Sequence, residues 1–134
     1  MMKFQYNKYK IKRKGDKNMS RRIDLHIHTT MSDGALTPKE VIDEASKNGT
    51  SIIAIADHDT IEAYNDELIS YAESKNITLI NAVEISTKTC KAGIHVLGYN
   101  FDLNDKQMKE RLYKLRNARP VSYTHLTLPT NSLV

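Results

Sequence analysis

The sequence contains one cysteine, Cys90, no tryptophan and no long apolar run. A single cysteine cannot form an intrachain disulfide or, alone, a cysteine-based zinc site, so we interpret Cys90 as structurally neutral. The longest apolar stretch, Ile52 to Ala56, is far shorter than the roughly 18 residues of a membrane helix. The N-terminus also lacks the apolar core of a secretory signal. These absences lead us to expect a cytoplasmic protein with no membrane partner.

The net charge of +4 raises the question of nucleic-acid binding. Its distribution argues against this, because residues 1–18 carry seven basic side chains against Asp16, and the remainder of the chain is net negative. This basic leader has no apolar periodicity, which is typical of a disordered arm. The hypothesis of a small DNA-binding protein rests on the leader alone, and we expect no sequence-specific DNA binding.

The chain has room for one domain at most, which we place at residues 19–120. Met19 directly precedes the first patterned strand and is our preferred start, so residues 1–18 are expected to be disordered or untranslated. Lys14-Gly15-Asp16 can be encoded by a purine-rich stretch that resembles a bacterial ribosome-binding site. A peptide spanning Lys17 to Arg21 in the native protein would contradict this start.

Residues 121–134 differ in composition from the rest of the chain. They contain no Asp, Glu, Lys or Arg, although charged residues are frequent up to Arg119. Residues 121–130 resemble one reading frame of a transposon-based sequencing adaptor, so we expect this tail to be an artefact and His125 to be no ligand. The alternative is a genuine flexible tail. The raw DNA sequence across codon 120 separates the two, because only an artefact predicts adaptor sequence there.

Strand and helix patterns alternate between these ends. Residues 23–28 alternate apolar and polar side chains, which predicts a strand with one polar face. Residues 51–56 are almost continuously apolar, as in a parallel strand buried on both faces. Thr37-Pro38-Lys39-Glu40 has the pattern of a capped helix start. The remaining predictions are a first helix ending at Asn48, a helix at 61–75, strands at 77–85 and 94–99 joined by a turn at 88–93, and a helix at 104–119.

Histidine and acidic residues gather at the predicted strand ends. His26 and His28 lie two positions apart on one strand, so they point to the same face and can bind one cation. A solvent-exposed polar face is the simpler alternative for this pair. Four further candidates lie at or near the ends of strands: Asp33, His58, Glu84 and His95.

Three of the four further candidates have a structural alternative. Asp33 could be a turn residue, His58 could support the start of the next helix, and His95 could face solvent. Glu84 is harder to explain in an otherwise apolar strand, because a half-buried carboxylate needs a cation or hydrogen-bond donors.

The motifs that contain these residues resemble the PHP (polymerase and histidinol phosphatase) family of metal-dependent phosphoesterases in order and spacing. The resemblance spans residues 23 to about 103. Within the family it is greatest to stand-alone bacterial phosphoesterases that act on nucleotides or short RNA. The motifs are Asp24-Leu25-His26-Ile27-His28-Thr29, Ser32-Asp33-Gly34, Ala56-Asp57-His58-Asp59-Thr60, Val83-Glu84-Ile85-Ser86 and His95-Val96-Leu97-Gly98-Tyr99.

The resemblance implies an α/β fold, the N-terminal portion of a distorted (β/α)7 barrel, with up to three metal ions at its C-terminal rim. By resemblance, His26 and His28 hold the first metal, and Glu84 bridges it to a second. His95 joins Glu84 on the second metal, while Asp33 and His58 hold the third. Manganese, zinc and iron all suit such mixed imidazole and carboxylate ligands.

The implied reaction is hydrolysis of a phosphate ester by a metal-bound water, while the cations neutralise the phosphate oxygens. No catalytic side chain is then required beyond this water. Asp24, Asp57 and Asp59 are candidates for orienting a ligand histidine through its second ring nitrogen, and each could equally be a cap or turn residue. The expected substrates are phosphorylated small molecules, nucleotides or short RNA.

The later motifs of the family, a further histidine and an Asp-x-His pair, have no counterpart in the sequence. We therefore expect an incomplete barrel with an exposed strand edge. The enzymatic activity is assigned to the full-length parent, and the fragment itself is expected to be inactive. The alternatives are a non-catalytic metal-binding PHP module and a histidinol-phosphate-type phosphatase.

Overall fold

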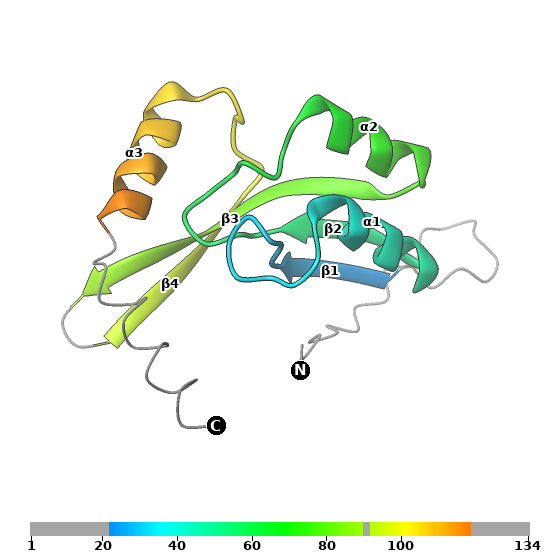
Figure 1. Cartoon of the computed structure of the whole chain (residues 1–134), viewed down its shortest axis with the longest axis horizontal. Helices are drawn as coiled ribbons and strands as arrows, with labels where there is room; N and C mark the ends of the chain where they lie inside the picture. Colours follow the sequence, from blue (N-terminus) through cyan, green and yellow to red (C-terminus); the bar gives the residue numbers. More distant parts are fainter. Residues whose placement is uncertain (1–21, 90–91, 119–134) are drawn as a thin grey trace, which may run out of the picture.

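The computed structural model describes residues 22–89 and 92–118. Its elements are β1 (Arg22–Ile27), α1 (Pro38–Lys47), β2 (Thr50–Ile55), α2 (Asp66–Ser74), β3 (Thr78–Thr89), β4 (Ala92–Tyr99) and α3 (Lys106–Asn117). One sheet has the strand order β1-β2-β3-β4, in which β1, β2 and β3 run parallel and β4 runs antiparallel to β3. Helices α1 and α2 lie together over the parallel strands, and α3 stands apart from them (Figure 1).

Helix α1 begins where the sequence predicts. Thr37 Oγ1 accepts the backbone N–H of Glu40 (3.3 Å), and the Glu40 carboxylate accepts the backbone N–H of Thr37 (2.8 Å), which completes a capping box. Pro38 occupies the first turn, where its missing N–H would have no helical partner. After the helix the chain turns at Gly49, whose φ of 69° is a left-handed conformation that glycine adopts easily.

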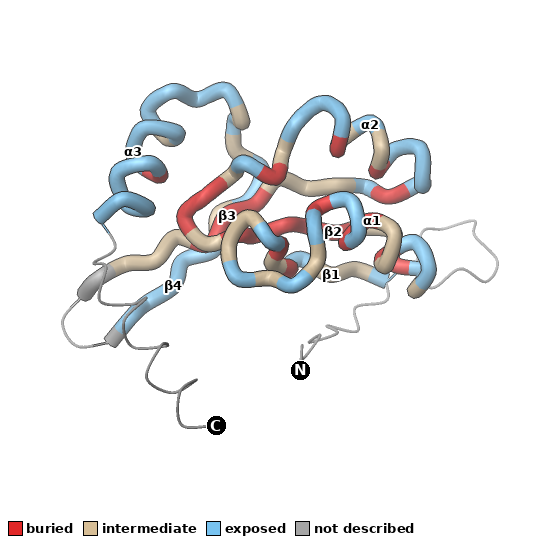
Figure 2. The backbone as a smooth tube through the Cα atoms, viewed as in Figure 1, coloured by how far each residue is buried: buried red, intermediate tan, exposed pale blue. Residues whose placement is uncertain are grey.

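The apolar core lies between the sheet and the helices α1 and α2. On β2, Ile53 and Ile55 belong to this layer, whereas Ala54 and the residue directly after the strand, Ala56, belong to a separate cluster on the opposite face. The buried backbone runs through β2 and along the sides of the two helices that face it (Figure 2). The strand is thus buried on both faces, as its continuous apolar run predicts.

The hydroxyl of Tyr64 fills a gap between β2 and β3. Regular pairing of β2 ends at Ile55, and contact resumes at the bridge between His58 and Glu84. In the gap, Tyr64 Oη accepts the backbone N–H groups of Ile55 (3.1 Å) and Ala82 (2.9 Å) and donates to the carbonyl of Ile55 (2.6 Å). Burial raises the pKa of Tyr64 above its ordinary value, so the hydroxyl keeps its proton. The hydroxyl of Tyr64 therefore supplies hydrogen bonds to backbone groups of β2 and β3 in the gap that precedes Glu84.

Helix α2 starts later than predicted. It begins at Asp66 rather than at Ile61, because Asn65 is the N-cap and accepts the backbone N–H of Leu68 (2.8 Å). The preceding residues form turns that carry Tyr64 into the gap between the strands. The prediction of one helix across residues 61–75 is therefore wrong in its first turn.

The β3–β4 hairpin is longer than predicted. Its pairing continues to Thr89 and Ala92, so most of the expected turn at 88–93 is strand. At the other end of β4, the hydroxyl of Tyr99 donates to the carbonyl of Leu25 in β1 (2.8 Å). Because β1 and β4 are the two edges of the described sheet, this bond requires the sheet to curl. Helix α3 agrees with the prediction within two residues and is capped by Asp105.

The proposed boundaries before residue 19 and after residue 120, together with Cys90, lie outside the described ranges and stay predictions. Within those ranges, every helix is too short or too polar to cross a membrane.

Replacing Tyr64 with phenylalanine leaves buried backbone groups of β2 and β3 without their partner. The loss of a partner for a buried polar group costs about 1–3 kcal/mol, so we expect the free energy of unfolding to fall by about 2 kcal/mol. Urea unfolding measures this loss. Tyr71→Phe is the matched control, because the hydroxyl of Tyr71 donates to Asp43 near the surface, and its loss should be clearly smaller. Equal losses in the two variants would contradict the role assigned to Tyr64.

Candidate metal centre

All six predicted ligands meet at one end of the sheet, where the parallel strands β1 and β2 finish. His26 and His28 come from the end of β1 and the residue after it, and Asp33 comes from the loop that follows. His58 follows β2, Glu84 lies in β3 and His95 lies in β4. The three parallel strands present their carboxyl ends at the same edge, where open α/β sheets place their ligand sites. The antiparallel pairing then adds His95, which lies opposite Ser86.

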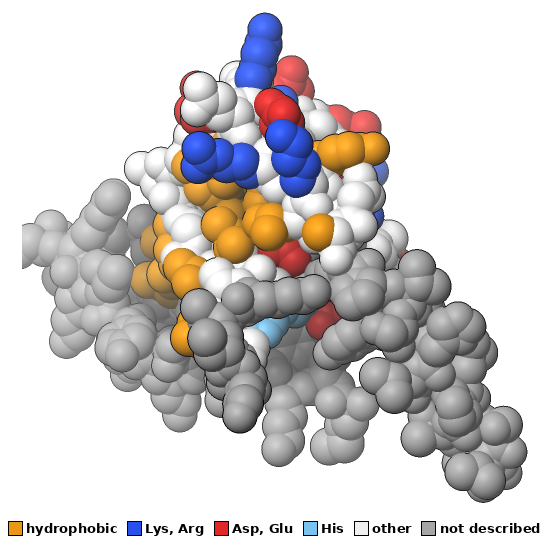
Figure 3. All heavy atoms as spheres, turned by 90° about the vertical axis from the view of Figure 1, so that its left-hand side faces the viewer, with side chains coloured by type: hydrophobic (Ala, Val, Ile, Leu, Met, Phe, Trp, Pro, Cys, Tyr) orange, Lys and Arg blue, Asp and Glu red, His pale blue; other side chains and the backbone are white. Residues whose placement is uncertain are grey.

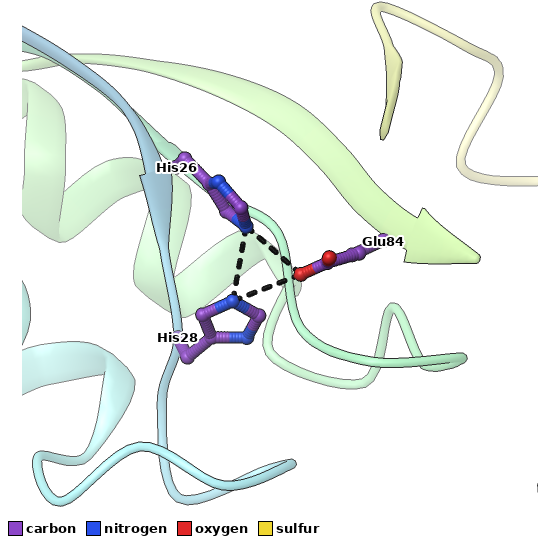
Figure 4. A group of neighbouring side chains, drawn as sticks. All are labelled: His26, His28 and Glu84. Atoms are coloured by element: carbon purple, nitrogen blue, oxygen red, sulfur yellow. Dashed lines mark hydrogen bonds and ion pairs between the residues drawn. The ribbon is translucent and has the colours of Figure 1, made fainter. Parts of the chain in front are cut away.

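Glu84 is the centre of this cluster. Its Oε2 lies 2.8 Å from His26 Nε2 and 3.0 Å from His28 Nε2, and its Oε1 lies 3.1 Å from His95 Nδ1. His58 Nδ1 is 3.7 Å from Glu84 Oε2. Figure 4 shows His26 and His28 reaching from β1 toward this carboxylate. Glu84 is only 7% exposed, so imidazole rings take the place of much of its water.

Asp33 contacts the cluster from the solvent side. Its Oδ1 lies 3.3 Å from His28 Nδ1, and its Oδ2 lies 3.3 Å from His58 Nε2. The rings of His28 and His58 are stacked, with centroids 4.6 Å apart. Asp33 is largely exposed, unlike Glu84, and it bridges two histidines that come from different strand ends.

The donor set of this cluster fits divalent metal ions. In each of three overlapping groups, the candidate ligand atoms lie within 4.8 Å of one another. The buried Nδ1 atoms of His28 and His58 lie 3.3 and 3.7 Å from the carboxylates of Asp33 and Glu84, but neither atom forms a hydrogen bond of normal geometry among the described residues. A buried polar atom without a partner requires an explanation, and a metal ion bound by imidazole and carboxylate supplies one. The groups are His26, His28 and Glu84; His28, Asp33 and His58; and His58, Glu84 and His95.

A bulge in β1 places Asp24 away from the histidines. The register shifts between the pairs Asp24–Ile53 and Ile27–Ile55, so β1 carries one residue more than β2 there. Asp24 therefore lines a small cavity of about 20 Å³ against α1, together with Ile27. Burial raises the pKa of Asp24, and its carboxylate accepts the backbone N–H of His26 (3.2 Å). The strict alternation predicted for residues 23–28 is wrong here, and Asp24 contacts the backbone of β1 rather than a ring.

Asp57 fixes the loop that carries Asp33. Its carboxylate accepts the backbone N–H and the hydroxyl of Thr29, both at 2.6 Å, and the hydroxyl of Ser32, also at 2.6 Å. Asp57 and Thr29 are both buried. The contact of Asp57 is thus with the chain directly after His28 and not with a histidine ring. Sequence reasoning gave no role to Thr29 or Ser32, because a short hydroxyl residue after a strand is too common to be a signal.

Asp59 joins the end of β2 to β3. Its carboxylate accepts the backbone N–H of Ser86 (2.8 Å), and its φ of 52° is in the left-handed region that aspartate tolerates better than most residues. The alternative that Asp59 caps the following helix is wrong, because Asn65 is the N-cap of α2.

The loop that carries Asp33 also requires glycine at position 34, a role that the sequence alone did not reveal. A Cβ at this position would collide with the carbonyl group of His28 and would lie 2.6 Å from the backbone nitrogen of Thr29. Because backbone atoms cannot yield without moving a strand end, only glycine lets the loop return this close to His28.

Two groups of the cluster have shifted pKa values. Burial raises the pKa of Glu84, but the hydrogen bond with His26 and the nearby imidazoles outweigh burial, so the pKa lies below its ordinary value. Burial lowers the pKa of His28 and outweighs the attraction of Asp33. Ionised carboxylate and neutral imidazole are the forms that bind metal ions, so both shifts favour the metal-binding forms.

Comparison with known proteins shows the family to which this chain is similar. The family model of the PHP domain matches residues 24–131. The chain is 40% identical over 101 residues to a 5'-3' exoribonuclease of Haemophilus influenzae, covering 75% of this chain and 36% of the relative. It is 35% identical over 97 residues to a 3',5'-nucleoside bisphosphate phosphatase of Chromobacterium violaceum, covering 72% and 34%. The chain thus spans about a third of the length of these relatives.

A solved structure agrees with the fold. An amidohydrolase from Chromobacterium violaceum, solved with bound sulfate and no metal, matches with a TM-score of 0.67 at 35% identity. The match covers 72% of this chain and 34% of that one. The predicted α/β fold is confirmed, and the described sheet corresponds to part of a barrel.

The lowered pKa of His28 makes the metal-free protein sensitive to acid. In the unfolded chain a histidine has a pKa of about 6.5, whereas folded His28 takes up its proton only at lower pH. As the pH falls through this value, the unfolded state binds the proton first, so the free energy of unfolding decreases. Urea unfolding in EDTA, above and below this pH, should show the decrease. His28→Gln should reduce the pH dependence, and an unchanged dependence would count against this origin.

Replacing Gly34 with alanine should displace the loop and with it His28 and Asp33. We expect manganese binding to weaken by more than about tenfold, as when other groups that position metal ligands are removed. Isothermal titration calorimetry measures the affinity. Gly98→Ala is the control, because its added Cβ would lie at an ordinary 3.6 Å from Val83 Cγ1. The same affinity in both variants would show that the close approach of Gly34 does not hold the site.

Proposed function

Because the chain belongs to the PHP domain family, we propose that it supplies ligands to the active site of a metal-dependent phosphoesterase. The observation that carries this proposal is the single carboxylate of Glu84 with four imidazoles around it. Metal-dependent hydrolysis of a phosphate ester is the reaction that best suits such a cluster.

The three overlapping ligand groups support a division into up to three ions. We propose that His26, His28 and Glu84 hold one ion, and that Glu84, His95 and His58 hold a second. Asp33 with the facing histidines would hold a third. Manganese, zinc and iron remain candidates, because mixed imidazole and carboxylate ligands suit all three.

Bound divalent ions supply an activated water and neutralise the charge of the phosphate oxygens. The side chains of this chain prepare the site for them. Glu84 stays ionised because its pKa is low, and His28 stays neutral because burial disfavours its charged form. Asp57 holds the loop of Asp33 through three hydrogen bonds, so this exposed carboxylate keeps its position opposite two histidines.

The names of the relatives support a substrate class. Two of them are named for RNA and for nucleoside bisphosphates, and a solved relative binds sulfate, an ion of similar shape and charge to phosphate. We propose a nucleotide or an RNA end as the substrate of this protein. The competing function is a metal-binding module without catalysis, which the small number of ligands in each group would also suit.

Glu84→Gln tests both functions, because it keeps the shape of the side chain and removes the negative charge that two of the candidate ligand groups share. We expect manganese binding to the chain to weaken by more than about tenfold, and hydrolysis of p-nitrophenyl phosphate and short RNA by the full product of the gene to be lost. Glu110→Gln is the matched control, since Glu110 is exposed and pairs with Lys114 on α3. A wild-type protein that binds manganese but hydrolyses none of these esters would instead be the non-catalytic module.

A further inference from the structure

A cavity of about 330 Å³ lies between α3 and the segment that follows His58. This volume is in the range of sites for small ligands. Asp59 and Thr60, the two residues after His58, contribute to its wall. The cavity therefore adjoins the metal centre through the chain itself, without containing any of the six candidate ligands.

One face of α3 forms the outer wall of the cavity. Lys109, Leu112, Tyr113 and Arg116 all line it, and their spacing of three and four residues places them on the same side of the helix. Leu112 is buried and anchors the helix, whereas the ring of Tyr113 is 69% exposed. Exposed aromatic and basic side chains thus stand next to each other on the side of α3 that faces the cavity.

The remaining walls combine apolar and polar side chains. Ile61 and Leu103 face the helix across the cavity. In Figure 3 hydrophobic side chains gather directly below the Lys and Arg side chains of this face of the molecule. An apolar surface bordered by positive charge suits a ligand that is flat and apolar at one end and anionic at the other.

Lys109 is the basic side chain of the wall that has no acidic partner among the described residues. Arg116 donates to Glu62 Oε2 (2.8 Å), and Asp59 accepts the backbone N–H of Ser86, so the two acids of the wall already have donors. Lys109 forms no ion pair with any residue in the described ranges. Helix α3 as a whole carries five basic side chains and one acidic one, which favours an anionic ligand.

We propose that this cavity binds the nucleoside part of the substrate, with the base against Tyr113 and a phosphate beside Lys109. The inference rests on the proposed phosphoesterase function, which places the ester to be cleaved at the metal centre. Stacking on a tyrosine stabilises any base, because every base has a π-face, and a lysine adds attraction to phosphate. A phosphorylated sugar without a base would leave the apolar wall exposed to water.

Binding of adenosine 5'-monophosphate to the purified chain, stripped of metal so that no ester is cleaved, tests this site. Calorimetry should show a loss of affinity of about tenfold in Tyr113→Ala, as for other stacked bases, and none in Tyr113→Phe. Lys109→Ala should weaken binding by roughly threefold to fivefold. Arg111→Ala is the matched control, because it removes the same charge from α3 at a position outside the cavity. Inorganic phosphate should bind equally well to wild type and Tyr113→Ala.

The proposal is overturned if the wild-type chain does not bind the nucleotide, or if Tyr113→Ala and Lys109→Ala bind it as wild type does. Circular dichroism verifies that the variants fold, which the exposure of Tyr113 leads us to expect. If the proposed phosphoesterase function is wrong, the result differs from a failure of the cavity proposal. Nucleotide binding that depends on Tyr113, with no hydrolysis by the full gene product in manganese, would overturn the enzyme and leave the cavity assignment standing.

Discussion

The structure is organised around a nearly buried carboxylate. A charged group removed from water is unstable unless opposite charge or hydrogen-bond donors surround it, and Glu84 has four imidazoles at 2.8 to 3.7 Å. Those rings come from three other parts of the sheet, so the carboxylate can exist only where the strands converge. The need to bring these groups together accounts for most of the irregular features of the fold.

Each irregular feature acts on a strand end. The gap between β2 and β3, which Tyr64 fills, lies directly before the bridge between His58 and Glu84. The bulge in β1 leaves the two histidines beside Glu84 while Asp24 lies against α1. Asp57 and Gly34 hold the following loop close to β1, which brings Asp33 to the cluster from outside. A regular sheet would satisfy its backbone more simply but would not assemble this site.

The sequence predicted what depends on local pattern. The capping box of α1, the apolar run of β2 and the six candidate ligands could all be read from residue type and spacing, and the structure brings those six together. The bulge in β1 and the late start of α2 could not, because each goes with contacts to elements that are distant along the chain: Asp24 lies against helix α1, and Tyr64 bonds to strands β2 and β3. For the same reason, Asp24, Asp57 and Asp59 were recognised as acids beside the candidate ligands, but their hydrogen bonds with backbone N–H groups and hydroxyls were not predicted.

The candidate ligands lie far apart along the chain, and this separation links metal binding to the persistence of the folded protein in the cell. His26 and Glu84 are 58 positions apart, and His95 lies further on, so an unfolded chain presents no arrangement that resembles the site. Long-range strand pairing is slow to form, and the full ligand set exists only once it is complete. A metal that binds the folded form alone stabilises it by mass action. Metal supply would therefore affect how much folded protein persists against proteolysis.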